Sequence, residues 1–159
     1  VVRIATKLDD ARQLRPLYGL LFGMCGVPCV YYGSEWGIEG EKCPGDHELR
    51  PALDAPQWNE LTDWLQALAA CRVPGHAGSE ALSWGDYHQV EVQPNQLLFQ
   101  RKSKRERLFV AVNAADVPYP FHFDAGCGRA VDVITGEDHD FGGGSEVAPF
   151  SSHFWLCER

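Results

Sequence analysis

The loop from Gly33 to Pro51 is the first part of the chain whose residue types could do chemistry. It is rich in glycine and charged residues, and a loop of this length within a compact domain usually has a function. Glu35 follows Gly33 and Ser34 at the end of a predicted strand, where a carboxylate could act as a catalytic acid. The sequence therefore directs attention to this loop before any other.

Cysteine and histidine are frequent enough to raise the question of a metal site, with six residues of each. Cys25 and Cys29 form a C-x-x-x-C pair, but no second pair stands at zinc spacing, and the histidines show no H-x-x-x-H pattern. We therefore expect no metal site and free, buried thiols in a reducing compartment. The sequence contains no Ser-His-Asp context, P-loop or dinucleotide fingerprint, and nothing in it requires a cofactor.

The elements up to about Val73 are predicted to be mixed helix and strand. Apolar residues at helical spacing favour a helix over 9–25, capped by Asp9 or Asp10. Either the helix proper starts near Leu14, which puts Pro16 in its first turn, or the helix kinks at Pro16. A short apolar run from Val27 to Tyr32 predicts a strand buried on both faces. A second helix is expected from about Pro56 to Cys71.

Beyond Gly78 the pattern changes to short apolar or alternating runs between turn signals. Pro94-Asn95, Thr135-Gly136 and the triple glycine 142–144 are such signals. The number of runs predicts an antiparallel β-sandwich of roughly seven or eight strands. The fold class expected for the whole chain is thus α+β.

Composition excludes several classes of function. The chain has 159 residues, of which 45% are hydrophobic and 23% charged, as in an ordinary globular protein. A net charge of -8 makes nucleic acid and anionic membrane surfaces poor partners. The apolar stretch from Leu17 to Tyr32 is interrupted by glycines and Pro28, so it is not a membrane span. Because the sequence begins at Val1 without an initiator Met, we expect a piece of a longer protein, whose targeting cannot be read.

Five segments carry a resemblance to a known family. Gly26 to Glu35 reads GVPCVYYGSE and resembles the G-x-P-x-x-Y-Y-G-(D/S)-E segment of the α-amylase family of glycoside hydrolases (family thirteen). Val1-Val2-Arg3 is similar to the end of that family's N-H-D-x-x-R stretch, and 46–50 (DHELR) to its D-x-x-x-R loop. Residues 96–113 and the VITGE turn at 133–137 resemble its C-terminal sandwich. The resemblance covers essentially the whole chain and is most like the neopullulanase, cyclomaltodextrinase and maltogenic amylase group.

The resemblance implies a fold and site residues. Residues 1–75 would be the C-terminal end of the catalytic (β/α)₈ barrel, including its eighth strand, and residues 78–159 the C-terminal β-sandwich. Asp46 and Arg50 would line the glucan groove, where a carboxylate and a guanidinium fork can each bind paired sugar hydroxyls; the alternative is a loop salt bridge without a ligand. Trp36 would stack on a sugar ring or pack beneath its own loop. Glu35 and Tyr32 would have supporting places beside the site.

The same resemblance implies that the chain lacks the chemistry itself. Retaining hydrolysis needs two carboxyl groups about 5 to 5.5 Å apart, and in this family they lie on the fourth and fifth barrel strands. No catalytic residue is therefore assigned here, and we expect an α-glucan hydrolase segment that is inactive alone. Calcium, bound by some relatives, is implied only for regions outside this sequence. The free thiols and the resemblance to mostly intracellular maltodextrin enzymes favour a cytoplasmic location.

Other interpretations stay open at this point. The sandwich could be a non-catalytic carbohydrate-binding module acting through exposed aromatic residues, with Trp84, Tyr87, Phe121 and Trp155 as candidates. The basic run from Arg101 to Arg107 could dock an acidic partner. A strand over 27–32 without neighbouring strands would have unpaired backbone groups, so we expect either homo-oligomerisation through this edge or a strongly altered local fold.

Overall fold

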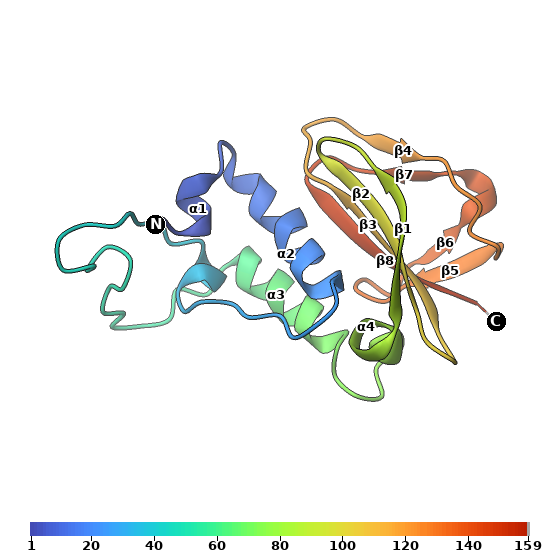
Figure 1. Ribbon diagram of the computed structural model, residues 1–159, viewed down its shortest axis with the longest axis horizontal. Helices are drawn as coiled ribbons and strands as arrows, with labels where there is room; N and C mark the ends of the chain where they lie inside the picture. Colours follow the sequence, from blue (N-terminus) through green and yellow to red (C-terminus); the bar gives the residue numbers. More distant parts are fainter. Residues whose placement is uncertain (159) are drawn as a thin grey trace.

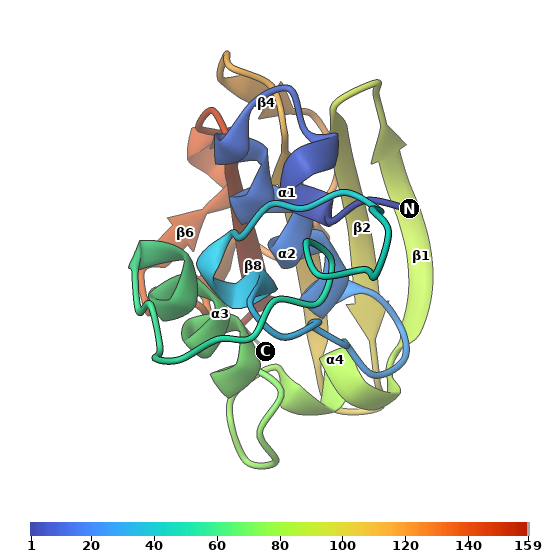
Figure 2. The ribbon, with the colours of Figure 1, turned by 90° about the vertical axis from the view of Figure 1, so that its left-hand side faces the viewer.

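A layer of helices and loops covers one face of an antiparallel sheet in the computed structural model, which describes residues 1–158 (Figure 1). Figure 2 looks onto the helical layer, with the sheet behind it. The helical elements are α1 (Ile4–Lys7), η1 (Ala11–Gln13), α2 (Leu14–Gly23), η2 (Ser34–Trp36), α3 (Glu60–Ala70), α4 (Ser79–Trp84) and η3 (Phe141–Gly143). Each described helix is too short or too polar to cross a membrane.

Eight strands confirm the predicted antiparallel β architecture of the second half. They are β1 (Asp86–Val92), β2 (Gln96–Lys102), β3 (Arg107–Asn113), β4 (Tyr119–Phe121), β5 (Arg129–Asp132), β6 (Asp138–Asp140), β7 (Ser145–Val147) and β8 (Ser151–Cys157). The larger sheet has the order β1-β2-β3-β8-β5-β6, and β4 pairs with β7 in a small second sheet. All pairs of strands are antiparallel.

The larger sheet separates two hydrophobic cores. Successive side chains of a strand point to opposite faces, so Phe154 packs in the core under the helices whereas Trp155 packs in the core under β4 and β7. Trp64 and Leu68 of α3 and Tyr18 of α2 belong to the first core. The helical layer is therefore held on the sheet by burial of apolar side chains.

The helix α2 begins at Leu14, so Pro16 lies in its first turn, as one of the two predicted alternatives requires. Asp10 accepts a hydrogen bond from the backbone N–H of Arg12 and caps the short η1, and α2 follows from Leu14. Pro16 is tolerated there because a first-turn residue has no intrahelical partner for its N–H. The helix is nevertheless shorter than predicted, since it ends at Gly23.

The second predicted helix, α3, starts later than expected. Asn59 caps it, accepting from the backbone N–H groups of Leu61 and Thr62, while Thr62 Oγ1 accepts from the backbone N–H of Asn59. This reciprocal capping box satisfies N–H groups that the first turn leaves free. Trp58 lies before the cap and is 60% exposed, so it is not part of the helix that was expected from about Pro56.

The prediction of a buried strand from Val27 to Tyr32 is wrong. Within residues 1–158 this segment pairs with no strand, and Val27 is 93% exposed. Its flanks are held by side chains instead: Arg72 donates to the carbonyl oxygen of Gly26, and Arg3 to that of Tyr32. An apolar run becomes a strand only when neighbouring strands supply backbone partners, and here none lies beside it. This outcome is the altered local fold that the sequence left open.

The expectation that all six cysteines are free is also wrong. Cys127 and Cys157 form a disulfide. The loop before β5 and the end of β8 meet because β5 pairs with β8, with Ala130 opposite Cys157. Cys25, Cys29, Cys43 and Cys71 are free, and Cys71 is the buried one among them.

Three residues proposed for surface roles are buried. Arg101 is 1% exposed and donates to the carbonyl oxygens of Gly23 and Gly85, so it joins the ends of α2 and α4 and does not belong to a basic surface. Trp155 is 2% exposed and Phe121 3%, which removes both from a carbohydrate-binding surface. Trp84 is 85% exposed, so it can still belong to a carbohydrate-binding surface.

Candidate functional site

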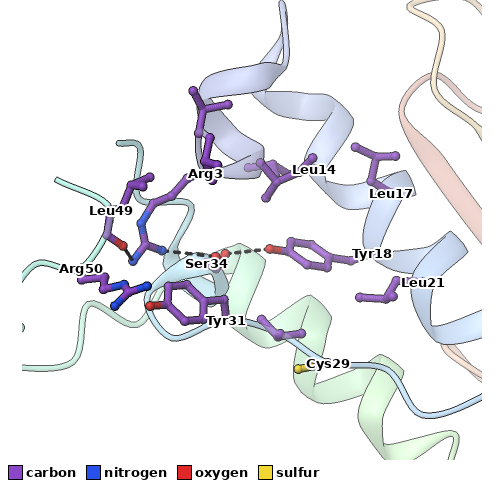
Figure 3. A pocket seen from close by; sticks show the side chains of 14 residues that line it. Arg3, Leu14, Leu17, Tyr18, Leu21, Cys29, Tyr31, Ser34, Leu49 and Arg50 are labelled. Atoms are coloured by element: carbon purple, nitrogen blue, oxygen red, sulfur yellow. Dashed lines mark hydrogen bonds between the residues drawn. The ribbon is translucent and has the colours of Figure 1, made fainter. Parts of the chain in front are cut away.

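A cavity of about 540 Å³ lies between the N-terminal residues, α2 and the loop that follows it (Figure 3). Leu14, Leu17 and Leu21 of α2 form one wall, and Tyr31 and Arg50 border the other side. The lining is thus mainly apolar with a few polar groups, the usual character of a small-molecule site.

Arg3 is the central polar residue of this cavity. Its guanidinium is buried and donates to the carbonyl oxygen of Leu49 at 2.7 Å, to that of Tyr32 at 3.0 Å and to Ser34 Oγ at 3.4 Å. It also lies 5.1 Å and 5.4 Å from the ring centres of Tyr31 and Tyr32, within reach of a cation–π attraction. Arg3 therefore fixes the position of two loop segments against the N-terminus.

Tyr18 holds the same loop from the side of α2. Its hydroxyl donates to the Ser34 carbonyl oxygen at 3.0 Å. Burial raises the pKa of Tyr18 above its usual value, more than its hydrogen bond to Ser34 lowers it. The hydroxyl consequently stays a proton donor at neutral pH.

Asp46 and Arg50 lie at opposite ends of one turn. The Arg50 N–H donates to the Asp46 carbonyl oxygen at 2.8 Å. Their side chains make no ion pair with each other in residues 1–158. Arg50 is exposed and borders the cavity, whereas Asp46 is half-buried and does not line it. The loop salt bridge that the sequence offered as the alternative to ligand binding is therefore not formed.

The other predicted residues are divided between two places. Tyr32 lies beside the cavity, donating its hydroxyl to the Pro51 carbonyl oxygen at 3.3 Å. Trp36 lines a different cavity of about 570 Å³, together with Trp64 and Phe150. Glu35 lies between the two, and its carbonyl oxygen accepts from Thr62 Oγ1. The structure thus groups Tyr32 with Arg50 and separates Trp36 from them.

The cavity holds groups for binding but no pair for acid–base catalysis. Its lining residues among the described part of the chain include no Asp or Glu. Guanidinium groups and apolar faces can orient a polyhydroxylated ring. They do not supply the two carboxyl groups that glycoside hydrolysis requires.

Sequence reasoning missed two arrangements. In the sequence Arg3 stands out only as the end of a motif, because nothing in sequence marks an arginine as buried among carbonyl oxygens. Cys43, His47 and Glu48 come within 4.8 Å of one another through their ligand atoms. Their i, i+4, i+5 spacing is visible in the loop, but it contains neither a second cysteine pair nor a histidine pair, which are the usual sequence signals of a zinc site.

The sequence of the chain is similar to part of several known enzymes. No family model matches the chain. The cyclomaltodextrinase of Geobacillus thermopakistaniensis is 28% identical over 134 residues, covering 80% of this chain and 22% of that protein. The maltogenic α-amylase of Bacillus acidopullulyticus is 26% identical over 131 residues, covering 77% of this chain and 22% of that protein. The chain therefore spans about a fifth of the length of these curated relatives.

The fold agrees over a longer range than the sequence. The crystal structure of an Anoxybacillus α-amylase matches 99% of this chain and 36% of that one with a TM-score of 0.83. At 19% identity this likeness shows the fold alone. The chain is thus similar in sequence to enzymes of the α-amylase family of glycoside hydrolases and shares its fold with part of such an enzyme.

Proposed function

We propose that this chain serves in a retaining α-glucan hydrolase that acts on starch, maltodextrin or cyclodextrin. The observation that carries the proposal is the sequence similarity over most of the chain to a cyclomaltodextrinase and a maltogenic amylase. Enzymes with the same fold have been crystallised with maltose and with acarbose, which supports a carbohydrate ligand. In this proposal residues 1–75 belong to the end of a catalytic barrel and residues 78–159 form the domain that packs beside it.

Within that function, Asp46 and Arg50 contact the glucan. Arg50 borders the cavity and is free of ion pairs among residues 1–158, so its guanidinium is available to sugar hydroxyls. Asp46 is tied to it through the backbone, which keeps both groups in one turn. Arg3 and Tyr32 have supporting roles, since they hold Leu49 and Pro51 at the two sides of Arg50. Trp36 faces the other cavity and would contact a longer glucan at most.

The isolated chain is expected to bind weakly and to hydrolyse nothing. The test is reducing-sugar release from maltodextrin, cyclodextrin and pullulan, with calorimetric titration of maltotriose into the same sample. We expect no turnover, and any binding heat should be lost in Arg50→Ala and kept in Arg129→Ala, a matched change of an exposed arginine on β5. Turnover that disappears in Glu35→Gln or Asp46→Asn would contradict the proposal.

A second function, carbohydrate binding without catalysis, is favoured by one observation. Trp84, at the end of α4, is 85% exposed, and exposed tryptophans stack on sugar rings. Retardation in starch-containing native gels would reveal it. Retardation lost in Trp84→Ala but kept in Arg50→Ala would favour the binding module over the cavity.

A further inference from the structure

Three potential metal ligands meet at the tip of the loop 42–50, outside the cavity described above. Cys43 Sγ lies 3.5 Å from His47 Nδ1, and a carboxylate oxygen of Glu48 completes a group whose atoms all lie within 4.8 Å of one another. In Figure 1 this loop is the teal segment beside the N-terminus that projects away from the sheets. The described part of the chain holds no second group of three such ligands.

A tight turn brings the ligands together. Gly45 and Asp46 both have left-handed backbone angles, with φ of 86° and 56°, and the Asp46 N–H donates to the Cys43 carbonyl oxygen at 3.0 Å. The left-handed conformation reverses the chain between Cys43 and His47, so that their side chains lie on the same side.

The base of the loop is fixed independently of the turn. The Lys42 N–H donates to the Val1 carbonyl oxygen at 3.0 Å on one side, and Arg3 donates to the Leu49 carbonyl oxygen on the other. A Cβ on Gly40 would lie 2.3 Å from the Glu48 carbonyl oxygen, so the two ends of the loop are in direct backbone contact. The three ligands therefore lie on a loop whose two ends are held together by hydrogen bonds and backbone contact.

The donor atoms and their spacing match zinc. A thiolate, an imidazole and a carboxylate are the three ligand types that Zn²⁺ takes. With Zn–S near 2.3 Å and Zn–N near 2.0 Å at a tetrahedral angle, the sulfur and nitrogen should be about 3.5 Å apart. The Cys43 to His47 distance in the structure is that value. Calcium and magnesium, which take oxygen ligands, would not select this group.

We propose that Cys43, His47 and Glu48 bind a zinc-class divalent ion, with the fourth position open to water. The three residues are exposed or half-buried, so an ion can enter without unfolding the loop. Bound metal links the two arms of the turn and restricts Asp46, which lies between its ligands. The competing explanation is a metal-free thiol–imidazole hydrogen bond between Cys43 and His47.

Titration of the 159-residue chain with Co²⁺ under anaerobic conditions tests the site, because cobalt bound by a thiolate shows a sulfur-to-metal charge-transfer band. We expect one equivalent to bind, and Zn²⁺ to displace it. Cys43→Ser should abolish the band, and His47→Ala and Glu48→Gln should each weaken the affinity by roughly tenfold or more, because each removes one of only three protein ligands. Cys29→Ser and His122→Ala are matched controls with exposed side chains outside the loop.

Three results would overturn the proposal. One is the absence of saturable cobalt binding, which would favour the metal-free hydrogen bond between Cys43 and His47. Another is a band that survives in Cys43→Ser and disappears in Cys29→Ser. The third is displacement of Co²⁺ by Ca²⁺ or Mg²⁺ as readily as by Zn²⁺, which would mean an acidic surface site. None of these depends on sugar binding, so the zinc site and the proposed function fail separately.

Discussion

Replacing Gly19 with alanine tests how α2 packs on the sheet, because two physical effects predict opposite signs. Glycine within a helix costs about 1 kcal/mol relative to alanine, so an unpacked helix would gain about that much. In the structure, however, a Cβ on Gly19 would lie 2.0 Å from Ser152 Oγ and 2.7 Å from Ser152 Cβ. Rotation of the serine moves Oγ, but its Cβ is fixed by the backbone of β8. The helix must therefore shift, and overpacking of this kind costs about 1–3 kcal/mol.

A double-mutant cycle separates the two effects. We expect Gly19→Ala to lower the free energy of unfolding in the native background, by up to about 2 kcal/mol after the helix-propensity gain is subtracted. With Ser152→Gly already in place the steric contact is gone, and Gly19→Ala should stabilise by about 1 kcal/mol. The coupling between the two substitutions then equals the contact itself, about 1–3 kcal/mol.

Urea denaturation followed by tryptophan fluorescence measures this cycle, since Trp64 of α3 lies 3.9 Å from the added Cβ and Trp155 lies on β8. The result that would refute the reasoning is stabilisation by about 1 kcal/mol in both backgrounds, as for a helix glycine facing solvent. Ser152→Ala is a further check. The Ser152 hydroxyl is buried without a hydrogen-bond partner, so its removal should leave stability equal or slightly higher.

Three further predictions concern the thiols, the disulfide and pH. Burial raises the pKa of Cys71 to about 12. A thiol reagent at neutral pH should therefore label the other free cysteines and react with Cys71 only after unfolding. Equal labelling of all four in the native state would argue against this packing. Replacing Cys127 and Cys157 with alanine should lower the stability by about 3 kcal/mol, because the disulfide closes a loop with a sequence separation of 30 residues; an unchanged urea midpoint would show that the bond contributes nothing. Burial, and then the nearby His153, lower the pKa of His139, so protonation of His139 favours the unfolded chain. The free energy of unfolding should therefore fall as the pH drops through about 6.5. In unfolding measured from pH 7.5 to 5, His139→Gln should make this free energy depend less on pH.

The site could be anticipated from sequence only in part. The loop Gly33 to Pro51 is marked by its length and composition, and the structure places Arg50 beside the mainly apolar cavity against α2. Arg3 could not be anticipated in the same way. Its role depends on carbonyl oxygens of Tyr32 and Leu49, which are far from it along the chain and identical in type to every other carbonyl.

The sequence by itself determined the elements whose signals are local. Alternating apolar runs between turn residues predicted the antiparallel strands, and Pro16 and its neighbours predicted the start of α2, because strand period and proline geometry act over a few residues. Only the tertiary structure decided the state of Val27 to Tyr32 and the pairing of Cys127 with Cys157. A strand needs partners across a sheet and a disulfide needs two distant thiols at bonding distance. Both conditions are set by the arrangement of distant segments, which no local pattern records.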